Sequence, residues 1–184
     1  MTGADHPNPQ AADGSLWTFA VNLYGAPGVA EACLGLQDEY GCDVNVLLFA
    51  AWMGAARHHT LTSAEMAEAA AIVRDWHAEI VRPLRSIRRR LKSGPAPAPN
   101  ATSEALRTRV KSVELEAERI ELAMLEALAE RACASGSSSG GESVQNLEVA
   151  VRHFSGGEVS AEALGLIQVI AKGLNMRMAT AAPK

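Results

Sequence analysis

Aromatic residues are scarce in this sequence: tryptophan, tyrosine and phenylalanine together make up 4% of its 184 residues. Long runs of β-branched residues, which strands favour, are also missing, whereas alanine is abundant. This composition argues against a sheet-based fold and predicts an all-α protein whose helices pack closely through small side chains. The length suffices for one well-buried core but is short for two full-sized domains.

The sequence also lacks a hydrophobic run long enough to cross a membrane. Its longest one, Val44 to Ala56, has 13 residues, against the roughly 20 that a transmembrane helix needs. Residues 1–14 have neither the basic start nor the apolar stretch of a secretory signal, so we expect a disordered leader there. Three cysteines without metal-binding spacing predict reduced thiols and a cytoplasmic location.

Motifs that dictate a chemistry are missing as well. The chain has no Walker loop, no Gly-x-Gly-x-x-Gly, no His-Glu-x-x-His and none of the Glu-x-x-His pairs of di-iron bundles. Residues 136–140 match Gly-x-Ser-x-Gly only formally, because they lie in a low-complexity spacer rather than between a strand and a helix. The sequence therefore predicts no catalytic residue, no metal ligand and no cofactor. The sequence favours a protein that is not an enzyme, but it does not exclude a catalytic activity.

The first third of the chain alternates helical segments with helix breakers. Apolar residues recur at helical spacing from Ser15 to Gly25, and again between Pro27 and Gly41. Asp43 is a typical N-cap for a third helix, because its carboxylate accepts hydrogen bonds from the free amides that follow. We therefore expect three helices before about residue 58.

Two long helices are predicted in the middle of the chain. Thr62 and Glu65 form a capping box, and an apolar row then continues at alternating intervals of four and three residues. Pro83 lies inside this row and predicts a kink, because the apolar spacing continues beyond it. A Pro-rich linker at 93–100 leads to a second long helix over 102–134. The linker is long enough to let the two long helices pack antiparallel. The rows are Met66, Ala70, Val73, His77, Ile80, Leu84, Ile87 and Leu91, and then Leu106, Val110, Val113, Ala117, Ile120, Met124 and Ala127.

The last third predicts two shorter amphipathic helices after a Gly/Ser-rich spacer at 135–142. We expect a single all-helical domain over 15–178, with a frayed tail at 179–184. The expected architecture is a bundle of about six to seven helices around the two long central ones.

The strongest charge feature is the segment RPLRSIRRRLK at 82–92, which carries six positive charges inside a chain of net charge −4. A helical turn of about 100° per residue places four of these cations in one stripe facing away from the apolar row: Arg82, Arg85, Arg89 and Lys92. Such a stripe binds phosphate, nucleic acid, anionic lipid or an acidic protein partner, or it only complements the helix dipole. Nucleic acid is the weaker candidate, because the whole chain is acidic and no aromatic residue lies among the arginines.

His77 occupies an apolar position of the first long helix and is the most notable single side chain. A buried histidine is usually hydrogen-bonded and structural, but one beside a pocket can transfer protons or contact a ligand. The three tryptophans are typical core residues, and they are also suited to line an apolar ligand pocket. The residues of this candidate pocket are Trp17, Trp52, Trp76 and His77.

Several segments resemble one protein family. They are Leu16-Trp17, the Pro-Gly-Val turn at Pro27, the Asp-Val-Asn cap at 43–45 and the Arg-Pro-Leu-Arg motif at 82–85. Over about residues 15–130 the chain resembles the uncharacterised bacterial proteins known as domain of unknown function 2390. The resemblance implies a small cytoplasmic bacterial helical protein, and it implies no particular activity or catalytic residues.

The sequence thus favours a non-enzymatic helical protein-interaction or regulatory module, with a protein partner or a second copy bound. One alternative is a binding protein or enzyme for a small anionic or amphipathic ligand near His77. A second alternative is nucleic-acid binding through the basic stripe.

Overall fold

The computed structural model describes residues 15–133 and 143–181, and every regular element in these ranges is helical. Since α4, η1 and α5 are continuous, the described chain forms seven helices, which confirms the predicted all-α bundle. None of the described helices is long and apolar enough to span a bilayer. The elements are α1 (Leu16–Tyr24), α2 (Val29–Tyr40), α3 (Val44–Ala55), α4 (Ser63–Trp76), the π-helix η1 (His77–Val81), α5 (Arg82–Leu91), α6 (Ala101–Cys133), α7 (Ser143–Ser155) and α8 (Ala161–Ala181).

Three segments predicted to lack regular structure can be compared with the described residues only in part. The leader at 1–14, the spacer at 135–142 and the last three residues of the predicted tail lie outside them. Helix α8 continues to Ala181, so the tail predicted from 179 begins inside this helix.

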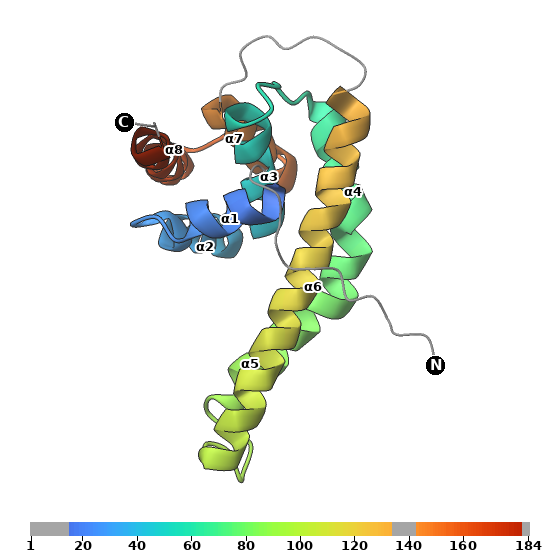
Figure 1. Ribbon diagram of the computed structural model, residues 1–184, viewed down its shortest axis with the longest axis vertical. Coiled ribbons are helices and arrows are strands. Elements are labelled where there is room, and N and C mark those ends of the chain that lie inside the picture. The colour runs from blue at the N-terminus through green and yellow to red at the C-terminus, as the bar shows by residue number, and fades with distance from the viewer. Residues whose placement is uncertain (1–14, 134–142, 182–184) are drawn as a thin grey trace.

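Two of the helices form a hairpin that projects beyond the rest of the molecule (Figure 1). Helix α6 runs antiparallel to the continuous helix α4–η1–α5, as the sequence predicts, and its C-terminal half packs against α1, α3 and α4. We call residues 82–118 the arm and the other described residues the body. In the arm, α5 packs on α6, whereas the body surrounds α6 on several sides.

Three helices begin at the caps that the sequence predicts. The Ser15 hydroxyl caps α1, and Oδ1 of Asp43 accepts a hydrogen bond of 2.8 Å from the amide of Asn45 at the start of α3. At the start of α4 the side chains of Thr62 and Glu65 each accept from the other's backbone amide, at 3.2 and 2.8 Å. Local sequence therefore determines where these helices start.

Helix α3 lies at the centre of the body and is buried almost all round. Helix α7 packs against it so closely that a Cβ atom added at Gly54 would lie 2.6 Å from Cα of Ser143. Asn146 of α7 is fully buried; its side chain accepts a hydrogen bond from the amide of Leu61 and donates to carbonyl groups of α3 and of the loop after it. Helix α7 is thus joined to α3 by packing and by hydrogen bonds.

The long helix stays continuous through Pro83 because the turn before it widens. Pro83 has no amide hydrogen to donate, and its ring would crowd the carbonyl group four residues earlier in an α-helix. Over His77–Val81 the backbone forms a π-helical turn instead, and the amide of Arg82 donates to the carbonyl of His77, five residues earlier. The kink predicted at Pro83 takes the form of this wider turn.

The π-turn corrects one part of the sequence prediction. Because it adds a residue to the turn, the side chains beyond it are rotated by about 100° relative to a continuous α-helix. Ile80 and Ile87, which we expected against the second long helix, are 38% and 51% exposed. Arg85 and Arg88 face α6 in their place. The predicted apolar contact is therefore wrong for this stretch.

Helix α6 shows the matching change in the arm. Its inward face carries Glu114, which is buried and pairs with Arg85 and Arg88. A buried carboxylate needs such partners, because leaving its charge unpaired would cost several kcal/mol, on the order of 3 to 5. Three residues of the predicted apolar row are accordingly turned outward, with exposed fractions of 43%, 48% and 48%: Leu106, Val113 and Ile120.

Candidate functional site

A groove opens between the C-terminal end of α2 and the long helix, at the level of η1 and α5. Its volume is about 610 Å³. It brings together two features that the sequence showed separately, His77 and the basic stripe. The lining includes Asp38 and Asp43 on one side and His77, Arg82, Arg85 and Arg89 on the other.

His77 lies at the start of the π-helix, between two buried carboxylates. Its Nδ1 atom is 2.9 Å from Oδ2 of Asp43 and 3.2 Å from Oε1 of Glu121. Glu121 is completely buried and Asp43 nearly so. The N-cap of α3, η1 and α6 thus meet at one histidine, where the body joins the hairpin.

Asn45 holds both carboxylates in place. Its backbone amide donates to Oδ1 of Asp43 at 2.8 Å, and its side-chain Nδ2 donates to Oε2 of Glu121 at 3.0 Å. Each carboxylate therefore has one oxygen bound by Asn45 and the other turned toward His77. These outer hydrogen bonds determine the orientation of the imidazole ring. Two of the four side chains in the cluster, Asp43 and Asn45, come from the Asp-Val-Asn segment.

Burial and charge shift the pKa values of all three groups. Burial alone would lower the pKa of His77, but the hydrogen bonds and charges of Asp43 and Glu121 raise it to about 9. Burial raises the pKa of Glu121 to about 7, and the charge of Asp43 acts in the same direction. Burial would also raise the pKa of Asp43, but its hydrogen bond to His77 and the charge of His77 hold it below the usual value. At neutral pH the histidine is therefore cationic, and Glu121 titrates near that pH.

Nε2 is the ring nitrogen of His77 that remains available to the groove. Asp43 and Glu121 both bind at Nδ1, and within the described chain no residue hydrogen-bonds to Nε2. Carboxylates at one ring nitrogen orient the ring and stabilise the imidazolium, whose other N–H can then donate a proton. The geometry therefore suits acid–base chemistry on a molecule bound in the groove.

The same three side chains are able to hold a cation. Asp43, His77 and Glu121 each offer one ligand atom, and these atoms lie within 4.8 Å of one another. One imidazole and two carboxylates suit a divalent metal, which would take the place of the proton on Nδ1. The members of this group come from separate helices and form no spaced motif, so a motif search of the sequence could not find them together.

Arg85 corrects the prediction of a stripe of four solvent-facing cations. Its guanidinium group donates to Glu118 at 2.6 Å, to Gln37 at 2.8 Å and to Glu114 at 3.3 Å. The π-turn is the reason, since it rotates Arg85 toward α6. Arg85 therefore joins α5 to α6 and α2 at the base of the groove.

The other cations of the stripe are exposed, as predicted. Arg82 and Arg89 line the groove, and neither forms an ion pair within the described ranges. Lys92 is exposed beyond the groove lining. Two of the four stripe residues are thus placed where they can meet a ligand beside His77.

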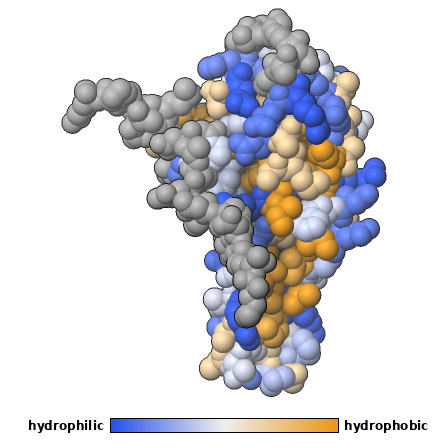
Figure 2. Space-filling view, turned by 45° about the vertical axis from the view of Figure 1, so that its right-hand side comes forward, coloured by the Kyte–Doolittle hydropathy of each residue, from blue (hydrophilic) through white to orange (hydrophobic). Residues whose placement is uncertain are grey.

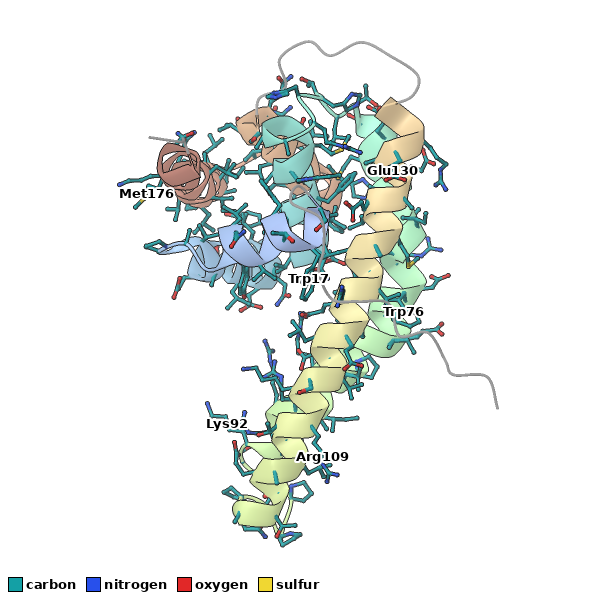
Figure 3. The ribbon with its side chains drawn as sticks, in the orientation of Figure 1. Trp17, Trp76, Lys92, Arg109, Glu130 and Met176 are labelled. Atoms are coloured by element: carbon teal, nitrogen blue, oxygen red, sulfur yellow. The ribbon has the colours of Figure 1, made fainter. Side chains whose placement is uncertain are left out.

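None of the three tryptophans lines the groove that His77 lines. Trp52 is buried in the core beside Phe49, and the guanidinium carbon of Arg119 lies 5.6 Å from the ring centre of Trp17. The indole of Trp76 donates to the carbonyl of Ala117 at 3.0 Å. Figure 3 shows Trp17 and Trp76 on opposite sides of α6. Of the predicted pocket of Trp17, Trp52, Trp76 and His77, the histidine alone lines the groove, because each tryptophan packs in a different contact.

Sequence reasoning missed Glu121 and assigned Asp43 only to a helix cap. A signal was present for the glutamates, since Glu114, Glu118 and Glu121 recur at intervals of four and three. Residues at this spacing share one face of a helix. Three acids on the inner face of a central helix indicate ion pairs or a buried polar site.

The family described as "Protein of unknown function (DUF2390)" matches residues 15–125. This range includes Asp43, His77, Glu121 and the groove arginines. No curated protein and no solved structure matches the chain. Because the family match covers more than half of the 184 residues, and because it agrees with the resemblance seen in the sequence, the chain belongs to the DUF2390 family.

Proposed function

We propose that the protein binds a small anionic ligand in the groove and that His77 exchanges a proton with it. The observation that carries this proposal is the setting of His77. Asp43 and Glu121 hold its ring at Nδ1, and Nε2 is left to a groove that includes Arg82 and Arg89, which form no ion pair among the described residues. The proposal follows the alternative of an anionic ligand near His77 that the sequence raised.

A phosphate or carboxylate group is the ligand chemistry that these cations favour. Arg82 and Arg89 lie two helical turns apart on one side of α5, about 10 Å along its axis, with Ser86 between them. Guanidinium groups bind such anions through paired hydrogen bonds. Asp43 and Glu121 offset the charge of the His77 imidazolium, so the ring contributes a hydrogen-bond donor at Nε2 rather than a third free positive charge. An anionic oxygen held by the arginines can accept that proton.

Nucleic acid fits the groove less well. Arg85 is neutralised by Glu114 and Glu118, which interrupts the basic stripe. The groove also carries two acids, Asp38 and Asp43, which would repel a phosphate backbone. A compact anion that avoids these acids is favoured over a long one.

Calorimetric titration with inorganic phosphate, pyrophosphate and succinate tests the binding step. We expect at least one of them to bind the wild type, and Arg82→Gln or Arg89→Gln to weaken binding by roughly tenfold or more, since each removes a charge-assisted hydrogen bond. Lys92→Gln is the matched control: it removes one positive charge at the C-terminal end of the same helix, outside the groove, and binding should persist. Absence of heat with all three probes, or equal losses for Lys92→Gln and Arg82→Gln, would contradict the proposal.

The proton step has its own readout. Titration near pH 9, close to the pKa of His77, in two buffers of different ionisation enthalpy measures the protons that the complex takes up from solvent. Because a bound anion favours the imidazolium, we expect proton uptake by the wild type and none by His77→Gln. A divalent cation that binds one per chain, and that His77→Gln or Glu121→Gln abolishes, would assign the cluster to metal binding and overturn the role of His77 in proton transfer.

Two further predictions from the sequence stay proposals. A cytoplasmic location is supported by the free thiols of Cys33 and Cys42, whose burial raises their pKa values to about 12 and keeps them unreactive. A protein-interaction role is supported by the exposed apolar side chains of the arm.

A further inference from the structure

The hairpin exposes apolar side chains along one of its faces. In the continuous helix α4–η1–α5, Ile80 and Ile87 are 38% and 51% exposed. In α6, Leu106, Val113 and Ile120 are 43% to 48% exposed. Figure 2 shows a hydrophobic band running down the hairpin. Monomeric soluble proteins rarely leave contiguous apolar surface of this kind uncovered.

Helix geometry places the two rows on the same side of the hairpin. The inward line of α5 runs through Arg85 and Arg88, and that of α6 runs through Glu114. Ile87 and Val113 are each rotated from these lines by roughly 100° to 130° in the same sense. Because the helices are antiparallel, rotations of the same sense lead to the same face. Arg82 and Arg89 are rotated the other way, toward the groove.

The charges beside the α6 row are complementary under a two-fold axis. Leu106 and Ile120 each lie seven residues from Val113, on either side of it. Arg109 lies four residues before Val113 and Glu116 three residues after it; both are exposed, and neither forms an ion pair within the described chain. Figure 3 shows Arg109 and Lys92 pointing to opposite sides of the arm. Arg109 is rotated by about 140° from the inward line of α6 in the same sense as Val113, and so away from the groove.

The same axis fits α5. The ion pair of Arg88 with Glu114 brings Ile87 level with Val113 along the hairpin. Leu84 and Leu91 flank Ile87 by three and four residues, and both are half-buried. A two-fold axis at this level therefore sets Leu106 against Ile120 of the other copy, Leu84 against Leu91, and Arg109 against Glu116.

We propose that this face, defined as Ile80, Leu84, Ile87, Leu106, Val113 and Ile120, binds a second copy of the chain. The two arms pack antiparallel, with α6 on α6 and α5 on α5, and form a four-helix bundle. The self-complementary charges favour a second copy over an unrelated partner, since an unrelated helix has no reason to match this order of residues. The groove lies on the opposite side of the hairpin and stays open in the dimer.

Light scattering coupled to size-exclusion chromatography tests the face. The wild type should elute with the mass of a dimer, and Val113→Glu and Ile87→Glu should each raise the dissociation constant by more than about tenfold, because each would bury an unpaired charge. Leu115→Glu is the matched control: Leu115 is 49% exposed on the same helix but lies about 200° away from Val113. It should remain dimeric. All three positions are about half exposed and tolerate a charge in the monomer, which circular dichroism verifies.

Charge exchange tests the antiparallel register. Arg109→Glu and Glu116→Arg should each weaken their own homodimer, because each sets like charges against one another. Mixed one to one, the two variants should form a heterodimer tighter than either homodimer, since both pairs are then opposite in sign. A monomeric wild type, a Leu115→Glu variant that dissociates as readily as Val113→Glu, or a mixture without preference for the heterodimer would overturn the proposal.

Discussion

Helix α6 passes through both the body and the arm, and its apolar residues have different surroundings in the two. In the body, Leu122, Leu125 and Leu128 are buried, because α1, α3 and α4 surround this part of the helix. In the arm, Val113 and Leu115 are about half exposed, because α5 covers only one side. A two-helix hairpin cannot bury an amphipathic helix completely, so its remaining apolar surface is available to a partner.

The interactions that stabilise the body differ from those that stabilise the arm. The body depends on apolar burial, with Trp52, Phe49 and Leu147 completely enclosed. The arm depends on the partly buried ion pairs of Arg85 and Arg88 with Glu114 and Glu118. Ion pairs of this kind determine register and orientation more than they add stability.

Truncating a leucine in each region should give the largest contrast. We expect Leu125→Ala to lower the free energy of unfolding by about 3 kcal/mol, because it removes completely buried methyl groups and leaves a cavity. Leu115→Ala on the same helix should cost less than about 0.5 kcal/mol, since this side chain is 49% exposed. Urea unfolding followed by circular dichroism measures both. Equal losses would show that the arm is packed as the body is.

Removing the buried carboxylate of the arm should separate the two regions. Glu114→Ala leaves Arg88 without its partner and Arg85 with fewer, and we expect a loss of about 2 kcal/mol that falls mainly on the arm. Amide hydrogen exchange should therefore quicken in α5 and in residues 101–118 of α6, while α3 and α7 keep their protection.

The control for that measurement is Glu104→Ala. Glu104 pairs with Arg107 on the exposed surface of the same helix, and its removal should leave the exchange pattern unchanged. Faster exchange throughout the body in Glu114→Ala would contradict the separation of arm and body.

The body was the more predictable region from sequence. Ser15, Asp43 and the Thr62–Glu65 box act within one helical turn, so their effect on helix starts is local and visible in the sequence. The apolar run at 44–56 likewise predicted the buried helix α3. These features depend on neighbours in the chain, which a single sequence displays.

The arm and the site were less predictable, because they depend on one backbone irregularity and on long-range contacts. Pro83 was visible, but the sequence does not show that the helix would respond with a π-turn rather than a simple bend. That one turn rotates Arg85 inward and Ile87 outward, while His77 at its start lies between Asp43 and Glu121. The contact of His77 with the two carboxylates joins α3, η1 and α6, so the helical spacing within any one of these elements could not reveal it.

The smallest expected effect is a pH dependence at the junction of body and arm. The folded-state pKa values of His77, about 9, and Glu121, about 7, lie above the usual values near 6.5 and 4.5, so the folded chain binds more protons than the unfolded one between about pH 5 and 9. Stability should therefore be highest near pH 5 and fall as the pH rises through 7 to 9, by on the order of 1 to 2 kcal/mol. Urea midpoints at a series of pH values measure this. Glu121→Gln should flatten the profile between about pH 5 and 7, and His77→Gln should flatten it between about pH 7 and 9. A wild type whose stability is constant or increases from pH 5 to 9 would show that the cluster does not hold its protons in the folded state.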